Sequence, residues 1–139
     1  MLKITSLDLS VLVREFQVLV GARLNKFYQL KNRFSLRIKS MNLNVVLPGL
    51  VFLSETLRYA APQATPLTMG IRKHVLNGVV RAVSQRGTER ILEIEIEKAG
   101  HHFFFLIELF SRGNIRYRTT STLGTASTSF PLLPQRALT

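Results

Sequence analysis

The chain has 139 residues, of which 46% are hydrophobic, and this suits one domain with a single core. It contains no cysteine and no apolar run long enough to cross a bilayer, which excludes disulfides, thiolate metal sites and a membrane-spanning helix, and we expect no membrane partner. Nineteen lysine and arginine residues against eight acids give a net charge of +11, so nucleic acid is the expected partner. A basic protein without a specific ligand is the alternative.

The first predicted element is an amphipathic helix over residues 6–20. Thr5 and Asp8 have the spacing of a capping box, in which a hydroxyl and an acid three residues later satisfy two backbone donors. Gly21 suits the left-handed residue that follows a helix. Apolar residues recur at helical spacing along one face: Leu9, Leu12, Val13, Phe16, Leu19 and Val20.

Strands follow this helix. Residues 22–30 and 33–39 are predicted to form a hairpin, and residues 44–54 give two short strands broken at Pro48-Gly49. In the second strand, apolar residues alternate with polar ones, which places three cations on its outward face: Arg33, Arg37 and Lys39.

A second helix is predicted to begin at Thr65-Pro66, a cap followed by a proline at the first position, and to stop at Gly78. Residues 79–85 and 90–97 form a second hairpin, followed by strands over 101–110 and 115–119. The predicted fold class is α+β, with mostly antiparallel sheets in a β-sandwich and two helices. We expect residues 1–118 to be the folded lobe and 119–139 to be a Ser/Thr-rich extension or linker.

Two charged ladders share the strand period. Glu93, Glu95 and Glu97 line one face of their strand, as Arg33, Arg37 and Lys39 do on theirs. If the two strands were neighbours, the ladders would pair with each other. If they were not, the cationic ladder could follow a phosphate backbone, and the sequence leaves both readings open.

Arg90 is expected on the same face of its strand as the apolar residues Leu92, Ile94 and Ile96. The strand over 101–110 is apolar on both faces, so we expect it to be central and Glu108 to be partly buried and in need of a partner. Arg90 is the candidate partner. The pair is either a structural ion pair, or an arginine that carboxylates orient toward a phosphate or base.

No enzyme is predicted. His101 and His102 are adjacent on a strand and point to opposite faces, so they cannot hold a metal ion together. Serine, histidine and aspartate show no spacing typical of a catalytic site. We therefore predict no catalytic residue, no metal and no cofactor.

Three segments resemble the N-terminal domain of the NFACT family of NEMF-like ribosome quality control factors: SLDLSVLVREFQVLVGARLNKFYQL, IRKHVLNGVVRAVSQRGTERILEIEI and LIELFSRGNI. The match in order and spacing covers roughly residues 4–118. The resemblance implies a fold similar to the N-terminal lobe of formamidopyrimidine-type DNA glycosylases. It also implies a non-enzymatic, RNA-binding role in the cytoplasm on the large ribosomal subunit, an organellar ribosome not being excluded.

The family resemblance also implies site residues. Asp8, Glu89 and Arg90 match the family positions that engage tRNA, with glutamate where the family has aspartate. Val51 stands where the family has an arginine. For contacts to the nucleic-acid backbone of tRNA or rRNA we predict these basic residues: Arg23, Lys26, Arg72, Lys73, Arg86 and Arg112.

The family's helix-hairpin-helix, coiled-coil and further RNA-binding modules do not follow in this sequence. The chain is then either a fragment or split component, with a second chain as partner that carries the missing modules, or a paralogue with another use. In the second case it is a structural subunit of a divergent ribosome or other ribonucleoprotein. The chain lacks the Pro-Glu start of the glycosylases and therefore their imino nucleophile.

Overall fold

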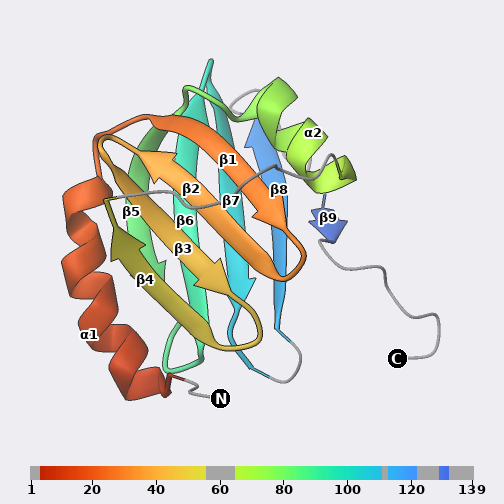
Figure 1. Ribbon diagram of the computed structural model, residues 1–139. Coiled ribbons are helices and arrows are strands. Elements are labelled where there is room, and N and C mark those ends of the chain that lie inside the picture. Colours follow the sequence, from red (N-terminus) through yellow and green to blue (C-terminus); the bar gives the residue numbers. More distant parts are fainter. Residues whose placement is uncertain (1–3, 56–64, 111–112, 122–128, 132–139) are drawn as a thin grey trace.

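Two antiparallel sheets pack face to face in the computed structural model, which describes residues 4–55, 65–110, 113–121 and 129–131 (Figure 1). The first sheet has the order β1 (Leu24–Leu30), β2 (Arg33–Ile38), β3 (Met41–Val46), β4 (Leu50–Ser54). The second has the order β5 (Val79–Gln85), β6 (Ile91–Lys98), β7 (His101–Glu108), β8 (Asn114–Ser121), β9 (Ser129–Pro131). The helices are α1 (Ser6–Phe16) and α2 (Pro66–His74), and a 3-10 turn, Gln17–Leu19, follows α1. This arrangement confirms the predicted α+β class.

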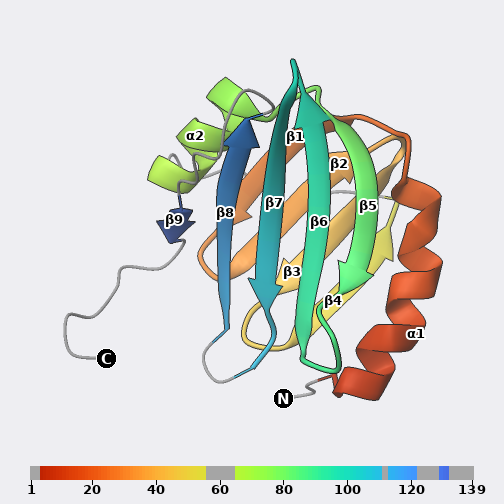
Figure 2. The same ribbon diagram turned by 180° about the vertical axis from the view of Figure 1, so that it is seen from behind.

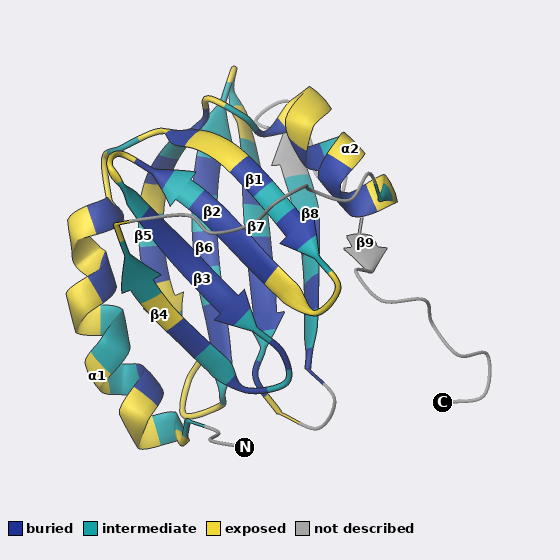
Figure 3. Ribbon diagram, in the orientation of Figure 1, coloured by how far each residue is buried: buried dark blue, intermediate teal, exposed yellow. Residues whose placement is uncertain are grey.

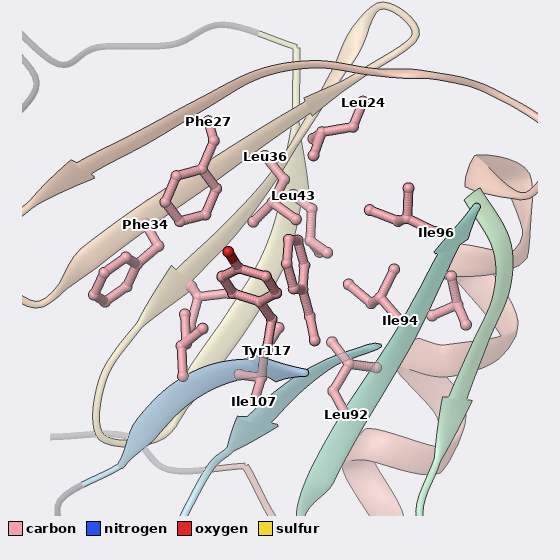
Figure 4. Packing of buried hydrophobic residues seen from close by; sticks show 14 of the residues in the cluster. Leu24, Phe27, Phe34, Leu36, Leu43, Leu92, Ile94, Ile96, Ile107 and Tyr117 are labelled. Carbon is pink, nitrogen blue, oxygen red and sulfur yellow. The ribbon is translucent and has the colours of Figure 1, made fainter. Parts of the chain in front are cut away.

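The core lies between the two sheets, whose inward side chains point toward one another (Figure 4). Phe27 of β1 lies 6.4 Å from Phe105 of β7, and Phe105 lies 5.8 Å from Tyr117 of β8, measured between ring centroids. Burying such a side chain stabilises the fold by about 1.5–3 kcal/mol. Burial is concentrated along the strands, while turns and the outward sides of the helices are exposed (Figure 3). As predicted, β7 is a central strand.

Helix α1 starts as predicted and ends earlier. The Thr5 N–H donates to Asp8 Oδ2 and the Asp8 N–H donates to Thr5 Oγ1, both at 3.0 Å, which is the expected capping box. The helix ends at Phe16, and Val20 is extended and exposed. The reason is the second sheet: the Gly21 N–H donates to the Val80 carbonyl at 2.7 Å, so pairing with β5 replaces further helical turns.

Helix α2 has the predicted cap and first-position proline, and it ends at His74. Asn77, rather than Gly78, takes the left-handed backbone conformation beyond it, with φ of 73°. Gly70 inside the helix is explained by packing, because a Cβ there would lie 2.8 Å from the Tyr117 hydroxyl. Neither α1 nor α2, the helices of the described ranges, is long and apolar enough to cross a membrane.

The two charged ladders lie in different sheets. The cations of β2 belong to the first sheet and the acids of β6 to the second, so the hypothesis that they pair across strands is wrong. The reason is topological: β2 pairs with β1 and β3, and β6 pairs with β5 and β7. At the other end of the chain, β9 pairs with β8, so part of the predicted 119–139 extension is joined to the second sheet. The boundary at residue 118 stays a prediction.

Candidate nucleic-acid interface

The start of α1 and the β5–β6 turn lie side by side at one end of the sandwich, which we call the hairpin end (Figures 1 and 2). Gln85, the last residue of β5, joins them. Its side-chain amide donates to the Ser6 carbonyl at 3.0 Å and to the Glu89 carbonyl at 2.7 Å. Asp8 on α1 and Glu89 and Arg90 on the turn are therefore brought to the same end, although they are far apart in the sequence.

Asp8 is exposed, and its charge is oriented by its own helix. Its carboxylate accepts a hydrogen bond from the Thr5 backbone N–H. This backbone bond, together with the Thr5 side chain, lowers the pKa of Asp8 below its usual value. A negative charge in the first turn also suits the helix dipole. Asp8 consequently remains ionised at neutral pH and faces solvent beside the β5–β6 turn.

Arg90 lies in the bend before β6 and is half-buried. The turn is closed by the Glu89 N–H, which donates to the Arg86 carbonyl at 3.1 Å, and by the Arg86 N–H, which donates to the Ile91 carbonyl at 3.0 Å. The Arg90 carbonyl accepts from the Leu109 N–H at 2.8 Å, which fixes the backbone against the end of β7. The backbone at Arg90 is thus held by hydrogen bonds, and the residue as a whole is partly exposed.

The expected pairing of Arg90 with Glu108 is wrong. Glu108 is partly buried, as predicted, with 19% of its side chain exposed, but its partner is Arg116 of β8, with Nη2 and Oε2 3.0 Å apart. Glu108 stands opposite Asn114 in the sheet, so Arg116 is its diagonal neighbour on the same outer face. No ion pair within the described ranges involves Arg90.

Two of the three glutamates of β6 also have partners within the second sheet. Glu97 pairs with Arg81 of β5 at 2.7 Å, and Glu95 pairs with Nδ1 of His102 at 2.8 Å. These contacts use the strands on either side of β6. On the described part of this face, three acids therefore have a cationic or histidine partner: Glu95, Glu97 and Glu108.

The residues predicted to contact a nucleic-acid backbone do not form one surface. Arg86 is exposed at the hairpin end, whereas Arg72 and Lys73 are exposed on the last turn of α2 near the opposite end (Figure 1). Arg23 is close to that opposite end, where its guanidinium donates to the Asn77 carbonyl at 2.9 Å. Arg112 lies outside the described residues.

Lys26 has neighbours that the sequence analysis did not select. It lines an open groove of about 510 Å³ on the outer face of the first sheet, together with Asn25, Tyr28, Arg37 and Lys39. The alternation of cations along β2 is the sequence signal for this groove, and the sequence alone left open whether these cations pair with the glutamates of β6. Val51, which stands at the family's arginine position, is buried in the core and contributes to neither site.

Two proteins named as ribosome quality control complex subunits are similar to this chain. It is 34% identical over 121 residues to ribosome quality control complex subunit 2 of Saccharomyces cerevisiae. It is 27% identical over 123 residues to the ribosome quality control complex subunit NEMF homolog of Drosophila melanogaster. Both alignments cover 81% of this chain and 12% of the relative, so the chain corresponds to a small part of each.

Two solved structures share the fold. The N-terminal domain of the fibronectin-binding protein PavA from Streptococcus pneumoniae superposes with a TM-score of 0.74 at 20% identity, over 84% of this chain and 52% of that one. The fibrinogen-binding protein from Staphylococcus aureus gives 0.61 at 21% identity, over 76% and 42%. At these identities the similarity establishes the fold.

The family described as NFACT N-terminal and middle domains matches residues 5–117. That range begins at the capping box of α1, includes the β5–β6 turn with Glu89 and Arg90, and ends within β8. Since the match takes in the two helices and nearly all of both sheets, the chain belongs to the NFACT N-terminal family.

Proposed function

We propose that the chain is a non-enzymatic RNA-binding lobe of a ribosome quality control factor, acting with tRNA on the large ribosomal subunit in the cytoplasm. One observation carries this proposal. In a member of the NFACT family, the fold gathers Asp8, Glu89 and Arg90 at one solvent-facing end, although Asp8 is far from the other two in sequence. The similarity to a glycosylase lobe stays a prediction.

The relatives support a ribosomal role. Both are named as subunits of a ribosome quality control complex. Because the chain spans 12% of each, association with the ribosome, tRNA engagement and dependence on further modules are proposed for this chain rather than transferred to it. A net charge of +11 provides the general attraction to RNA that such a role needs.

The hairpin end offers two kinds of contact. Arg90 is free of ion pairs to the described residues and presents a guanidinium that can bind a phosphate or a base edge through two parallel hydrogen bonds. Arg86 lies exposed on the same turn and can bind a neighbouring phosphate. Asp8 and Glu89 are exposed acids beside these arginines; they can accept hydrogen bonds from bases or riboses and repel misplaced phosphates.

Measuring tRNA affinity against salt concentration tests the proposal. If several phosphates are contacted, the logarithm of the association constant should fall by about 0.9 per duplex contact for each log unit of salt. A flat dependence would contradict RNA binding. Retention on ribosomal particles through a high-salt wash would instead favour a structural ribonucleoprotein subunit.

Substitution of Arg90 separates recognition from folding. Arg90→Ala should lower tRNA affinity while leaving the thermal melt close to that of the parent chain, because its guanidinium makes no ion pair within the described ranges. Arg14→Ala removes an exposed arginine of α1 outside the matched motif positions and serves as the control. Equal losses of affinity in both variants would show that only net charge matters.

A further inference from the structure

A second basic site lies on the outer face of the first sheet, away from the hairpin end. The groove that contains it is lined by five residues of β1, β2 and the adjoining turn: Asn25, Lys26, Tyr28, Arg37 and Lys39. Three of them are cations and one is aromatic. We call this the β1–β2 groove.

The register of the sheet places like charges against each other in this groove. Lys26 of β1 is the direct cross-strand partner of Arg37 of β2. Side chains in such positions have Cβ atoms about 4.5–5.5 Å apart, and like charges directly opposite are destabilising. Such an arrangement is unfavourable for the folded chain alone and becomes favourable when an anion binds between the two side chains.

Acids do not offset these cations within the described residues. None of the ion pairs found there involves Lys26, Arg37 or Lys39. Arg37 donates from Nη1 to the Glu55 backbone carbonyl at 3.3 Å, which orients the guanidinium without neutralising it. The Asn25 side chain donates to the Lys39 carbonyl at 3.5 Å and links the β2–β3 turn to β1.

We propose that the β1–β2 groove binds the backbone of a single-stranded RNA segment. Lys26 and Arg37 hold a phosphate between them, and Lys39 contacts the same or the next phosphate. This inference rests on the proposed function, and it assigns a second contact surface that is separate from Asp8, Glu89 and Arg90.

The aromatic residue favours RNA over an acidic polypeptide. Tyr28 is two residues beyond Lys26 on β1 and lies on the same outer face, about 6.6 Å along the strand. A ring beside a cationic pair is the usual arrangement for single-stranded nucleic acid, with the phosphate on the cations and a base stacked on the ring. The guanidinium of Arg37 fits a carboxylate as well as a phosphate, so the ring of Tyr28 is what favours RNA.

The chain offers a matched control for Arg37. Arg33 has the same side chain, lies on the same strand and faces the same way. Its cross-strand neighbours in the sheet are the apolar Leu30 and Val46 rather than a cation, and it is not among the residues that line the groove. Arg33→Gln and Arg37→Gln therefore remove equal charge from one strand, and only the second changes the proposed site.

Binding of fluorescent oligouridylate to the 139-residue chain tests the inference, with anisotropy as the readout. Arg37→Gln should weaken binding several-fold and reduce the salt slope by about 0.7, the value for one single-strand phosphate contact. Arg33→Gln should change both much less, and Tyr28→Leu should weaken binding without changing the slope. Equal effects of Arg33→Gln and Arg37→Gln would overturn the inference, as would tighter binding of polyglutamate than of oligouridylate.

Thermal melts at low salt give a second readout. Arg37→Gln should raise the melting temperature of the free chain, because it removes the repulsion from Lys26, and oligouridylate should stabilise this variant less than the parent. A parent chain that binds oligouridylate and tRNA, with Arg37→Gln indistinguishable from it, would refute the groove alone. A parent chain that binds neither RNA would refute the proposed function as well.

Discussion

The outer faces of both sheets carry charged side chains, but the neighbours of these side chains differ in sign. On the second sheet, each of three acids has a cationic or histidine partner: Glu95 with His102, Glu97 with Arg81, and Glu108 with Arg116. On the first sheet, Lys26 and Arg37 stand opposite each other. The difference lies in which strands are neighbours, since both faces follow the same two-residue period.

This contrast separates charge that stabilises the fold from charge available to a ligand. A cation with an acid across the strand contributes to folding and is partly neutralised. A cation that faces another cation contributes nothing favourable until an anion arrives. The first sheet is therefore the better candidate for RNA contact, although the second also carries exposed arginine.

Placing an acid opposite a cation on the first sheet, as on the second, should have the largest effect on RNA binding. Lys26→Glu would place a carboxylate opposite Arg37, remove one phosphate contact and occupy the other cation. We expect oligouridylate affinity to fall more than tenfold, which corresponds to about 1.4 kcal/mol, while unfolding in denaturant becomes harder by about 0.2–1 kcal/mol.

Arg33→Glu is the control for that substitution. It makes the same kind of charge change on the same sheet, opposite the apolar residues Leu30 and Val46. It should reduce affinity through net charge only and should not stabilise the chain. If Lys26→Glu and Arg33→Glu behaved alike in both assays, the contrast between the two faces would have no functional meaning.

Breaking the ion pair of Glu108, the most buried of the three paired acids described on the second sheet, should have the next largest effect. Glu108→Gln leaves Arg116 without its charged partner, and we expect the free energy of unfolding to drop by about 1–2 kcal/mol, measured by urea titration. Glu93→Gln is the matched control, because Glu93 lies on the same face and forms no ion pair within the described ranges. A smaller loss for Glu108→Gln than for Glu93→Gln would show that the pair does not stabilise the sheet.

The exposed pair of the same sheet should matter less. Arg81 and Glu97 are 53% and 34% exposed, so water and salt weaken their attraction. Arg81→Gln should lower the free energy of unfolding by less than about 1 kcal/mol, and molar salt should abolish the difference. A loss that persists in high salt would assign Arg81 a packing role.

Local patterns were sufficient to predict most of the elements. The capping box of α1, the proline start of α2 and the central position of the apolar β7 each depend on neighbours in the sequence, and each is confirmed. The alternation in β2 is confirmed in part, because the polar Ser35 between Phe34 and Leu36 is also buried. The predicted end of α1 at residue 20 is wrong because the Gly21 N–H donates to the Val80 carbonyl, which belongs to a strand far away in the sequence. The periodicity of apolar residues in a short segment does not reveal contacts between residues that are far apart in the sequence.

The site was harder to predict for the same reason. The sequence indicates that Glu108 needs a partner and leaves open whether Arg37 has one, but only the strand order decides which residues are neighbours. Arg116, diagonal to Glu108 on the next strand, could have been proposed from the β7–β8 pairing alone. That Arg37 has no acid of β6 as its partner could be inferred only from the position of β6 in the other sheet.

The smallest effect concerns Asp8, whose charge is satisfied within its own helix cap and so resembles the acids of the second sheet. Its folded-state pKa is lowered below the model-peptide value of 3.8 by the Thr5 backbone bond and then the Thr5 hydroxyl. Its contribution to stability is therefore fully present above pH 3.8 and is lost as the pH falls through the folded-state pKa.

Asp8→Asn keeps an oxygen acceptor and removes this titration. The variant should therefore be slightly less stable than the parent chain by a constant amount near neutrality, and the difference should vanish in acid. If the same variant also loses tRNA affinity at neutral pH, Asp8 contributes to RNA contact as well as to the cap. If affinity is unchanged while the deficit remains, the role of Asp8 is confined to the start of α1, and recognition at the hairpin end rests on Arg86, Glu89 and Arg90.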